Sequence, residues 1–415
     1  MERKKVISAL WFGMAALMVL TAALLCSCTG QQNTAAASAG GAVPAADEAA
    51  GQPTEKPSSG GLTLEALTLE QKVGQLFMVR PDALDPTQTR EQINAADAAG
   101  VTELTEPMRE TLAHCPVGGI CQFGKNIESP EQLLRFNQAL QSASDIPLLL
   151  AVDEEGGRVA RLANHQAFDL PHYQSAAAVG ETGDPREAYE MGRTIGAYLR
   201  EYGFNMDFAP VADVNTNPDN PVIGTRAFSA DCETAAAMAL EMARGLESQG
   251  VLPTFKHFPG HGDTAEDSHT GLAVSRRTKE ELLHCELLPY QQAAAGKGPA
   301  EYAVMVGHIA VPELTGDDVP ASLSAQIVTG LLRQELNAAG SLVVTDSLAM
   351  QAITDAYGPG EAAVAALEAG CDLLLMPDGL EDAYQAVLTA VRQGRISEQR
   401  LDESVGRILQ IKQQF

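Results

Sequence analysis

The sequence is short of positive charge and of aromatic side chains. It has 28 lysines and arginines against 54 aspartates and glutamates, a formal net charge of −26, and one tryptophan within an aromatic fraction of 5%. Binding to nucleic-acid phosphates needs a basic surface, so this balance argues against nucleic acid as a partner. It also argues against a polybasic membrane patch. The hydrophobic fraction of 45% is still ample for a large core.

Cysteine is scarce beyond the N-terminal segment. Five cysteines remain there: Cys115, Cys121, Cys232, Cys285 and Cys371. An odd number excludes a fully paired set of intramolecular disulfides. Cys121 and Cys371 sit inside apolar runs, which favours buried thiols, and a Cys115–Cys121 pair is left open.

A long uncharged run occurs at the N-terminus. A basic stretch, Arg3-Lys4-Lys5, precedes the almost wholly apolar residues 6–25, and small residues and a cysteine follow, as in a secretory signal peptide. Leu25-Cys26-Ser27-Cys28 resembles a bacterial lipobox, which predicts a signal peptide over residues 1–27 and a lipid on Cys28. Cys26 fits less well, because Leu25 directly precedes it. A plain transmembrane anchor is the alternative. Both interpretations predict an extracytoplasmic protein anchored to the cell membrane.

Residues 28–61 have almost no large apolar side chains. They consist mainly of Ala, Gly, Ser, Pro and Gln, which bury too little surface to fold. We predict a flexible tether there and a folded catalytic domain over residues 62–415.

Eight short apolar runs recur through the folded part, mostly bounded by Gly, Pro, Asp or His. Such continuous runs suit strands buried on both faces, as in parallel sheets. They cover residues 73–79, 117–123, 147–152, 205–210, 251–255, 302–306, 341–345 and 371–376. Helical patterns lie between most of them, at 131–142, 185–202, 234–248, 279–295, 324–338, 359–369, 380–393 and 397–414. This alternation predicts an α/β fold, a single (β/α)₈ TIM barrel, in which residues 82–114 form the expected insertion.

Polar residues follow the predicted strands where such a barrel carries its active site. In (β/α)₈ barrels that site lies at the C-terminal ends of the strands. Five successive runs, the third to the seventh, are followed there by charged or imidazole side chains: the stretch from Asp153 to Arg158, Asp213 with Asn215, Lys256 with His257, His308, and Asp346 with Ser347. Random loops would seldom show this pattern.

The segment from Lys256 to His269 is dense in proton carriers. It holds three of the eight histidines, three acidic residues and a lysine. It follows the apolar run 251–255, so we expect the strand to end there and a loop to begin. Solvated loops favour Ser, Asn, Lys and Glu over clustered histidine, so the segment is typical of a reactive site. A zinc site built from His257, His261, Asp263, Asp267 and His269 is an alternative interpretation.

This segment resembles the signature of glycoside hydrolase family 3, in particular its bacterial β-N-acetylglucosaminidase branch. Three further segments resemble motifs of the same family: Asp153–Arg161, Asn220–Ser229 and Val344–Met350. The resemblance covers essentially residues 62–415. It implies a retaining exo-β-N-acetylglucosaminidase that removes terminal GlcNAc from peptidoglycan fragments or related glycans, without a cofactor or a metal.

The resemblance also implies a role for individual residues. Asp346 would be the nucleophile, and His269, oriented by Asp267, would be the acid/base. The residues implied to bind the sugar are Asp153, Arg161, Arg226, Lys256 and His257, and those behind them are Arg158, Asp213, Asn215 and His308. Retaining hydrolysis needs a carboxylate nucleophile and a separate proton donor, and histidine exchanges protons near neutral pH. The alternatives are a helix cap for Asp346 and ion pairs to neighbouring carboxylates for the arginines.

Two other functions fit parts of the sequence. A metal-dependent barrel hydrolase would use the histidine cluster as ligands, although zinc sites usually draw ligands from several elements. A sugar-binding lipoprotein would share the lipobox and the tether, but it should show two lobes instead of eight βα units.

Overall fold

The structure is a computed structural model that describes residues 63–415, apart from residues 96, 269–270 and 299–300. The predicted signal peptide, Cys28 and the tether therefore lie outside the described residues, and so does His269. Within the described ranges, no helix is both long enough and apolar enough to cross a lipid bilayer.

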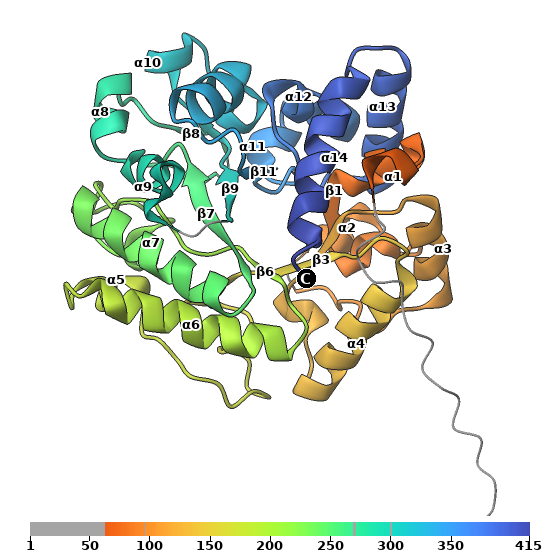
Figure 1. The fold of residues 1–415 in the computed structure, drawn as a ribbon, viewed down its shortest axis with the longest axis horizontal. Helices are drawn as coiled ribbons and strands as arrows, with labels where there is room; N and C mark the ends of the chain where they lie inside the picture. Colours follow the sequence, from red (N-terminus) through yellow and green to blue (C-terminus); the bar gives the residue numbers. More distant parts are fainter. Residues whose placement is uncertain (1–62, 96, 269–270, 299–300) are drawn as a thin grey trace, which may run out of the picture. The chain divides into compact units, whose positions relative to one another are not determined.

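Eight parallel strands form the centre of the fold (Figure 1). Each strand pairs with its successor in the chain, and the first strand pairs with the last, Phe77 opposite Leu374. A bridge between Val344 and Leu373 connects the two remaining edges, so the predicted (β/α)₈ barrel is confirmed. The strands are β1 (Phe77–Val79), β2 (Gly119–Gln122), β3 (Leu149–Val152), β6 (Met206–Asp207), β7 (Leu252–Phe258), β9 (Ala303–Val306), β11 (Leu342–Thr345) and β12 (Leu374–Leu375).

Every residue of these eight strands is buried. One face of each strand fills the barrel and the other packs under the helices, so neither face meets water. This double burial explains why the strands appear in the sequence as continuous apolar runs and show no alternation of apolar and polar residues.

Helices surround the barrel (Figure 1). The longer ones are α3 (Glu106–His114), α4 (Pro130–Ala143), α6 (Pro185–Glu201), α7 (Cys232–Ser248), α12 (Pro359–Ala369), α13 (Leu380–Arg392) and α14 (Glu398–Lys412). Several begin at a side-chain cap: Ser129, Asp184, Asp231 and Ser397 each accept a hydrogen bond from a backbone N–H of the first turn. The shorter helices are α1 (Leu69–Gln75), α2 (Arg90–Asn94), α5 (Ala176–Gly180), α8 (Lys279–His284), α9 (Leu288–Gln292), α10 (Pro312–Thr315) and α11 (Gln351–Thr354).

Four predicted elements differ from the structure in extent or type. Residues 73–75 belong to α1, because Thr68 and Gln71 form a capping box that starts a helix there, and β1 begins only at Phe77. β7 continues to Phe258, so Lys256 and His257 are strand residues. The single helix expected over residues 279–295 is broken into α8, α9 and the π-helix η6 (Ala293–Lys297). The helix expected over 324–338 is a π-helix, η8 (Gln326–Glu335).

The insertion at residues 82–114 is fastened to the barrel by a buried carboxylate. Asp82 accepts hydrogen bonds from Asn126 Nδ2 at 2.8 Å and from the backbone N–H of Val101 at 3.1 Å. Lys125 Nζ lies 3.5 Å from the same carboxylate. The insertion is therefore held against the segment that follows β2.

One disulfide links two neighbouring βα units. Cys232, the first residue of α7, is bonded to Cys285, which ends α8. The sequence did not predict this pair. Cys121 and Cys371 are buried free thiols, as predicted, and so is Cys115, which therefore does not pair with Cys121.

Candidate active site

The predicted site residues converge at the C-terminal ends of the strands. Asp153 directly follows β3, Lys256 and His257 end β7, and Asp346 directly follows β11. Arg226 reaches the same region from η5 (Gly224–Arg226), in the connection after β6. The strand order fixed by the barrel brings together residues up to 193 positions apart, from Asp153 to Asp346.

Lys256 is the hub of a buried ion-pair cluster. Its Nζ lies 2.8 Å from Asp153 Oδ1 and 2.6 Å from Glu155 Oε1, although only 2% of the side chain is exposed. Burial alone would lower the pKa of Lys256, but the two carboxylates outweigh burial and raise it. The ammonium group therefore stays charged, and its donors point at the carboxylates that line the mouth.

Two arginines complete this cluster. Arg226 binds Glu155 through two hydrogen bonds, from Nε at 2.8 Å and from Nη2 at 2.7 Å. Arg161 Nη2 lies 3.4 Å from Asp153 Oδ2. Burial would raise the pKa of Glu155, but Arg226 and Lys256 lower it to about 2. In Asp153 the charges of Lys256 and Arg161 likewise outweigh burial, so its pKa lies well below its usual range.

The cluster remains partly open to solvent. The side chains of Asp153 and Arg161 are 17% and 34% exposed, whereas Glu155 is almost fully buried. An ionised carboxylate accepts hydrogen bonds only, and a guanidinium only donates them. The open edge can therefore bind a ligand that carries neighbouring hydroxyl and carbonyl groups.

Asp213 fixes the C-terminal end of β7 in position. Its Oδ2 lies 2.7 Å from His257 Nδ1, and its two oxygens accept the backbone N–H groups of His257 and His261. Burial would raise the pKa of Asp213, but His257 and the hydrogen bonds lower it. The carboxylate fixes the orientation of the His257 ring, which leaves Nε2 as the nitrogen that can face a ligand.

The loop after β7 packs tightly against the connection that follows β6. Gly262 has no space for a side chain, because a Cβ there would lie 1.8 Å from the carbonyl oxygen of Val214. Asp263 is bound on the outside by Arg277 Nη2 at 3.0 Å. Asp267 is half-buried and Ser268 is buried, while His269, the predicted acid/base, lies outside the described residues.

Asp346 is half-buried, and its main chain is fixed on both sides. Its N–H donates to the carbonyl of Val306, and its Oδ1 accepts the N–H of Ser347 at 2.7 Å. His308 Nε2 lies 2.8 Å from the carbonyl oxygen of Ser347, and its Nδ1 lies 2.8 Å from Ser322 Oγ. These contacts fix the chain on both sides of the carboxylate that the sequence predicts as the nucleophile.

Glu155 was missed by sequence reasoning as a site residue. It stands within the motif-like segment after β3, but its separate role as the partner of Arg226 and Lys256 appears only in three dimensions. Its partners lie 71 and 101 positions away along the chain, and no local pattern indicates such a contact. Arg158, predicted to lie behind the site, donates to the carbonyl of Val222.

The described part of the chain does not bring together three His, Cys, Asp or Glu side chains in a way that would hold a metal ion. His269, one of the ligands in the zinc interpretation, is outside the residues to which this statement applies.

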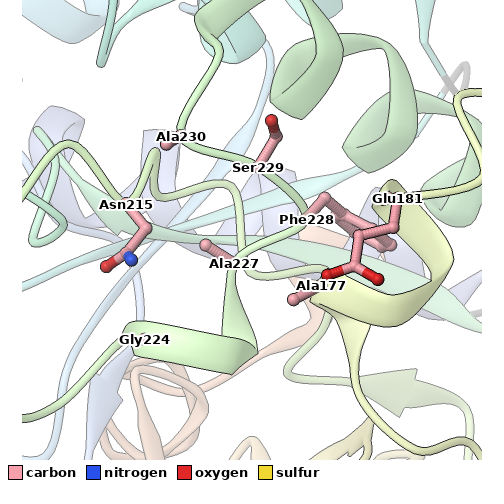
Figure 2. A pocket seen from close by; sticks show the side chains of 9 residues that line it. Ala177, Glu181, Asn215, Gly224, Ala227, Phe228, Ser229 and Ala230 are labelled. Carbon is pink, nitrogen blue, oxygen red and sulfur yellow. The ribbon is translucent and has the colours of Figure 1, made fainter. Parts of the chain in front are cut away.

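A pocket of about 240 Å³ lies beside the site (Figure 2). It is lined by α5 and the connection after β6, including Glu181, Asn215, Gly224 and Ser229. None of the residues predicted to bind the sugar lines it. It is therefore separate from the Lys256 cluster.

Comparisons with known proteins agree with this geometry. Residues 68–411 match the family model described as the N-terminal domain of glycosyl hydrolase family 3. The chain is 35% identical to beta-hexosaminidase A of Pseudoalteromonas piscicida, over 76% of this chain and 56% of that protein. It is 34% identical to beta-hexosaminidase LpqI of Mycobacterium tuberculosis over 96% of each chain.

A solved structure agrees with the family match. A glycoside hydrolase family 3 beta-N-acetylglucosaminidase from Paenibacillus superposes with a TM-score of 0.75 at 41% identity, covering 84% of this chain and 63% of that one. The chain thus spans less than two thirds of the length of the Pseudoalteromonas and Paenibacillus proteins.

Proposed function

Because the chain belongs to glycosyl hydrolase family 3, we propose that it is a retaining exo-β-N-acetylglucosaminidase. The observation that supports this most is the convergence of Asp346, His257 and the Lys256 cluster at the mouth of the barrel. A carboxylate nucleophile there faces side chains suited to hydroxyl and amide groups of a sugar.

The residues have distinct tasks in the proposed reaction. Asp153 accepts hydrogen bonds from sugar hydroxyls, while Arg161, Arg226, Lys256 and His257 donate to hydroxyls and to the N-acetyl carbonyl. The lowered pKa of Asp153 supports its task, because the carboxylate stays ionised at neutral pH. Glu155 keeps Arg226 and Lys256 in place.

Chemistry proceeds in two displacements. A carboxylate oxygen of Asp346 attacks the anomeric carbon, and the glycosidic oxygen leaves with a proton from His269. A water molecule, deprotonated by His269, then attacks the same carbon and releases Asp346. Asp267 orients the imidazole and stabilises its charged form.

The substrate class we propose is GlcNAc-terminated peptidoglycan fragments or related amino-sugar glycans. The names of the related beta-hexosaminidases support an N-acetylhexosamine at the cleaved position. We further propose an extracytoplasmic enzyme anchored through a lipid on Cys28. The Cys232–Cys285 disulfide supports this location, since disulfides persist in oxidising compartments.

Release of nitrophenol from aryl β-glycosides of GlcNAc, GalNAc and glucose tests the activity. We expect hydrolysis of the GlcNAc compound, unchanged by a chelator. A fluorinated glycosyl inhibitor should label Asp346, and Asp346→Asn should lower kcat by roughly 10⁴-fold or more. Labelling of another carboxylate would refute the nucleophile, and inactivation by chelator with rescue by zinc would favour the metal-dependent alternative.

Two variants test the remaining assignments. His269→Ala should harm substrates with poor leaving groups far more than activated aryl glycosides, which need little protonation. Equal losses on both would remove His269 from the acid role. Cys28→Ala should release the protein from the membrane fraction or leave it unprocessed, and wild-type fractionation and migration would exclude a lipid on Cys28.

A further inference from the structure

His261 is a buried imidazole that bonds the loop after β7 to itself. Only 2% of the residue is exposed. Its Nδ1 lies 2.7 Å from Thr264 Oγ1, and its Nε2 lies 3.0 Å from Ser268 Oγ. One ring thus connects residues three and seven positions further along the loop.

The direction of these hydrogen bonds follows from the number of protons available. Thr264 Oγ1 lies 2.9 Å from the carbonyl oxygen of His261, which can only accept, so the hydroxyl proton points there. The same oxygen must then accept from Nδ1–H. Nε2 is left as the acceptor for the Ser268 hydroxyl. The result is a neutral imidazole, in agreement with burial and the nearby His257, which lower the pKa of His261.

The main chain on the N-terminal side of the loop is fixed independently of this ring. The N–H of His261 donates to Asp213 Oδ1 at 2.7 Å. Asn220 Nδ2 donates to the carbonyls of His261 and Thr264 at 2.8 and 2.9 Å. These contacts attach residues 261–264 to the connection that follows β6.

The rest of the loop lacks a core of its own. Between Pro259 and Ser268 the only apolar side chain is that of Ala265, and it is exposed. A loop segment without buried apolar surface has little to hold it in one conformation. The His261 ring links the anchored residue 261 directly to Ser268.

We propose that His261 is a positioning residue that holds Ser268, and with it the neighbouring Asp267, at the mouth of the barrel. The inference rests on the proposed function, in which Asp267 belongs to the acid/base pair. His261 does not itself transfer the proton; it acts through its hydrogen bond to Ser268.

A double-mutant cycle on the full-length protein tests this inference. His261→Ala and Ser268→Ala should each lower kcat for a substrate with a poor leaving group by roughly 10- to 100-fold, a part of the 10²–10⁴ that general acid catalysis contributes. Activated aryl glycosides should lose much less. Because both changes break one hydrogen bond, the double variant should be no worse than His261→Ala.

Two conservative variants separate the two nitrogens of the ring. The amide nitrogen of Gln reaches the place of Nε2, where it donates to Ser268 Oγ instead of accepting from it. The amide nitrogen of Asn reaches the place of Nδ1. His261→Gln should therefore retain the bond to Ser268 and most of the activity, whereas His261→Asn should resemble Ser268→Ala. If His261→Ala does not fold, His261→Gln, His261→Asn and Ser268→Ala together show whether His261 holds Ser268.

Hydrogen exchange of a peptide covering residues 259–268 gives a readout that does not depend on activity. Protection should fall in Ser268→Ala and His261→Asn. Ser322→Ala is the matched control, since it removes the same kind of hydroxyl–imidazole bond from His308, outside this loop. It should leave the protection of 259–268 unchanged.

Failure of the role of His261 and failure of the proposed glycosidase function would give different results. Additive losses, equal protection in Ser268→Ala and wild type, or equal effects on good and poor leaving groups would overturn the role of His261. If the wild type hydrolysed no aryl glycoside, the proposed function would fall, and the exchange data alone would then decide whether His261 holds Ser268.

Discussion

The two ends of the barrel bury aspartates in different ways. Asp213 lies at the mouth, and Asp372 lies at the opposite end, just before β12. Neither is more than 1% exposed, and in both the groups that contact the carboxylate outweigh burial and lower its pKa. The two carboxylates differ in the groups that they hold.

Asp372 binds side chains that belong to the framework. It accepts from Arg333 Nη2 at 2.6 Å, from Ser404 Oγ at 2.7 Å and from Arg407 Nε at 3.2 Å. The last two residues lie on α14, so the cluster joins the last helix to the barrel. Arg333, which binds Asp372, also donates hydrogen bonds to the carbonyl of Gly370.

Asp213 holds His257, which follows Lys256 in β7, and Lys256 binds the partly exposed Asp153. A closed network of charges stabilises the fold, whereas one with an open edge can bind a ligand. The type of the buried residue does not distinguish these roles; the exposure of its neighbours does.

Asp372→Ala should have the largest effect on stability. Removing the carboxylate leaves Arg333, Arg400 and Arg407 without their shared anion, and breaking a buried ion pair costs about 3–5 kcal/mol. Denaturant unfolding should show this loss, while the folded fraction keeps a kcat close to that of the wild type. A drop in kcat without a drop in stability would contradict the assignment of this cluster to the framework.

Lys412→Met should stabilise the protein in a pH-dependent way. Lys412 is buried on α14, where its Nζ donates to Gln75 Oε1 at 2.5 Å, and burial lowers its pKa from 10.5 to about 7. Below pH 7 the folded state carries a buried charge. Between pH 7 and 10 the unfolded chain holds a proton that the folded chain has released, so wild-type stability gains with rising pH.

The variant should therefore gain on the order of 3 kcal/mol over wild type at pH 6, with the gain shrinking toward pH 10. Loss of the bond to Gln75 reduces the gain somewhat. Unfolding of both proteins across this pH range checks the prediction. If the difference in unfolding free energy between the two proteins did not change with pH, the buried ammonium group would not be its cause.

Asp213→Asn should lower kcat/KM by roughly 10- to 100-fold, as expected when a residue that orients a site group is lost. The amide of Asn cannot accept from both His257 and His261. The loss of stability should be smaller than for Asp372→Ala, since no arginine is left unpaired. Equal losses of stability in the two variants would remove the distinction between the two ends of the barrel.

Asp207→Asn should have the smallest effect, below about 1 kcal/mol in stability. Burial raises the pKa of Asp207 well above its usual range, which favours the neutral carboxyl group that Asn resembles. Its Oδ1 accepts from the N–H of Glu154, while Oδ2 has no hydrogen-bond partner among the described atoms. Denaturant unfolding at neutral pH checks this, and a large loss would show that the group is ionised.

The sequence predicted the barrel because double burial makes its strands visible as apolar runs. It predicted less well where tertiary contacts override local pattern, as at α1 and in the broken helix that contains Cys285. The positions of Asp153, Lys256 and Asp346 at strand ends followed from strand order. Their partners did not, because Glu155 and Ser268 are recognised only once distant segments or a folded loop bring them together.

Because β1 pairs with β12, the barrel can close only after its last strand has been synthesised. During synthesis from the N-terminus, β1 has only β2 beside it until residue 374 has been made. Arg400, Ser404 and Arg407, which neutralise or cap Asp372, come later still. A nascent chain that stops before residue 374 would thus expose an open sheet edge, and one that stops before α14 would leave Asp372 without the three partners that α14 supplies. The barrel and the Asp372 cluster are therefore complete only after α14 has been made.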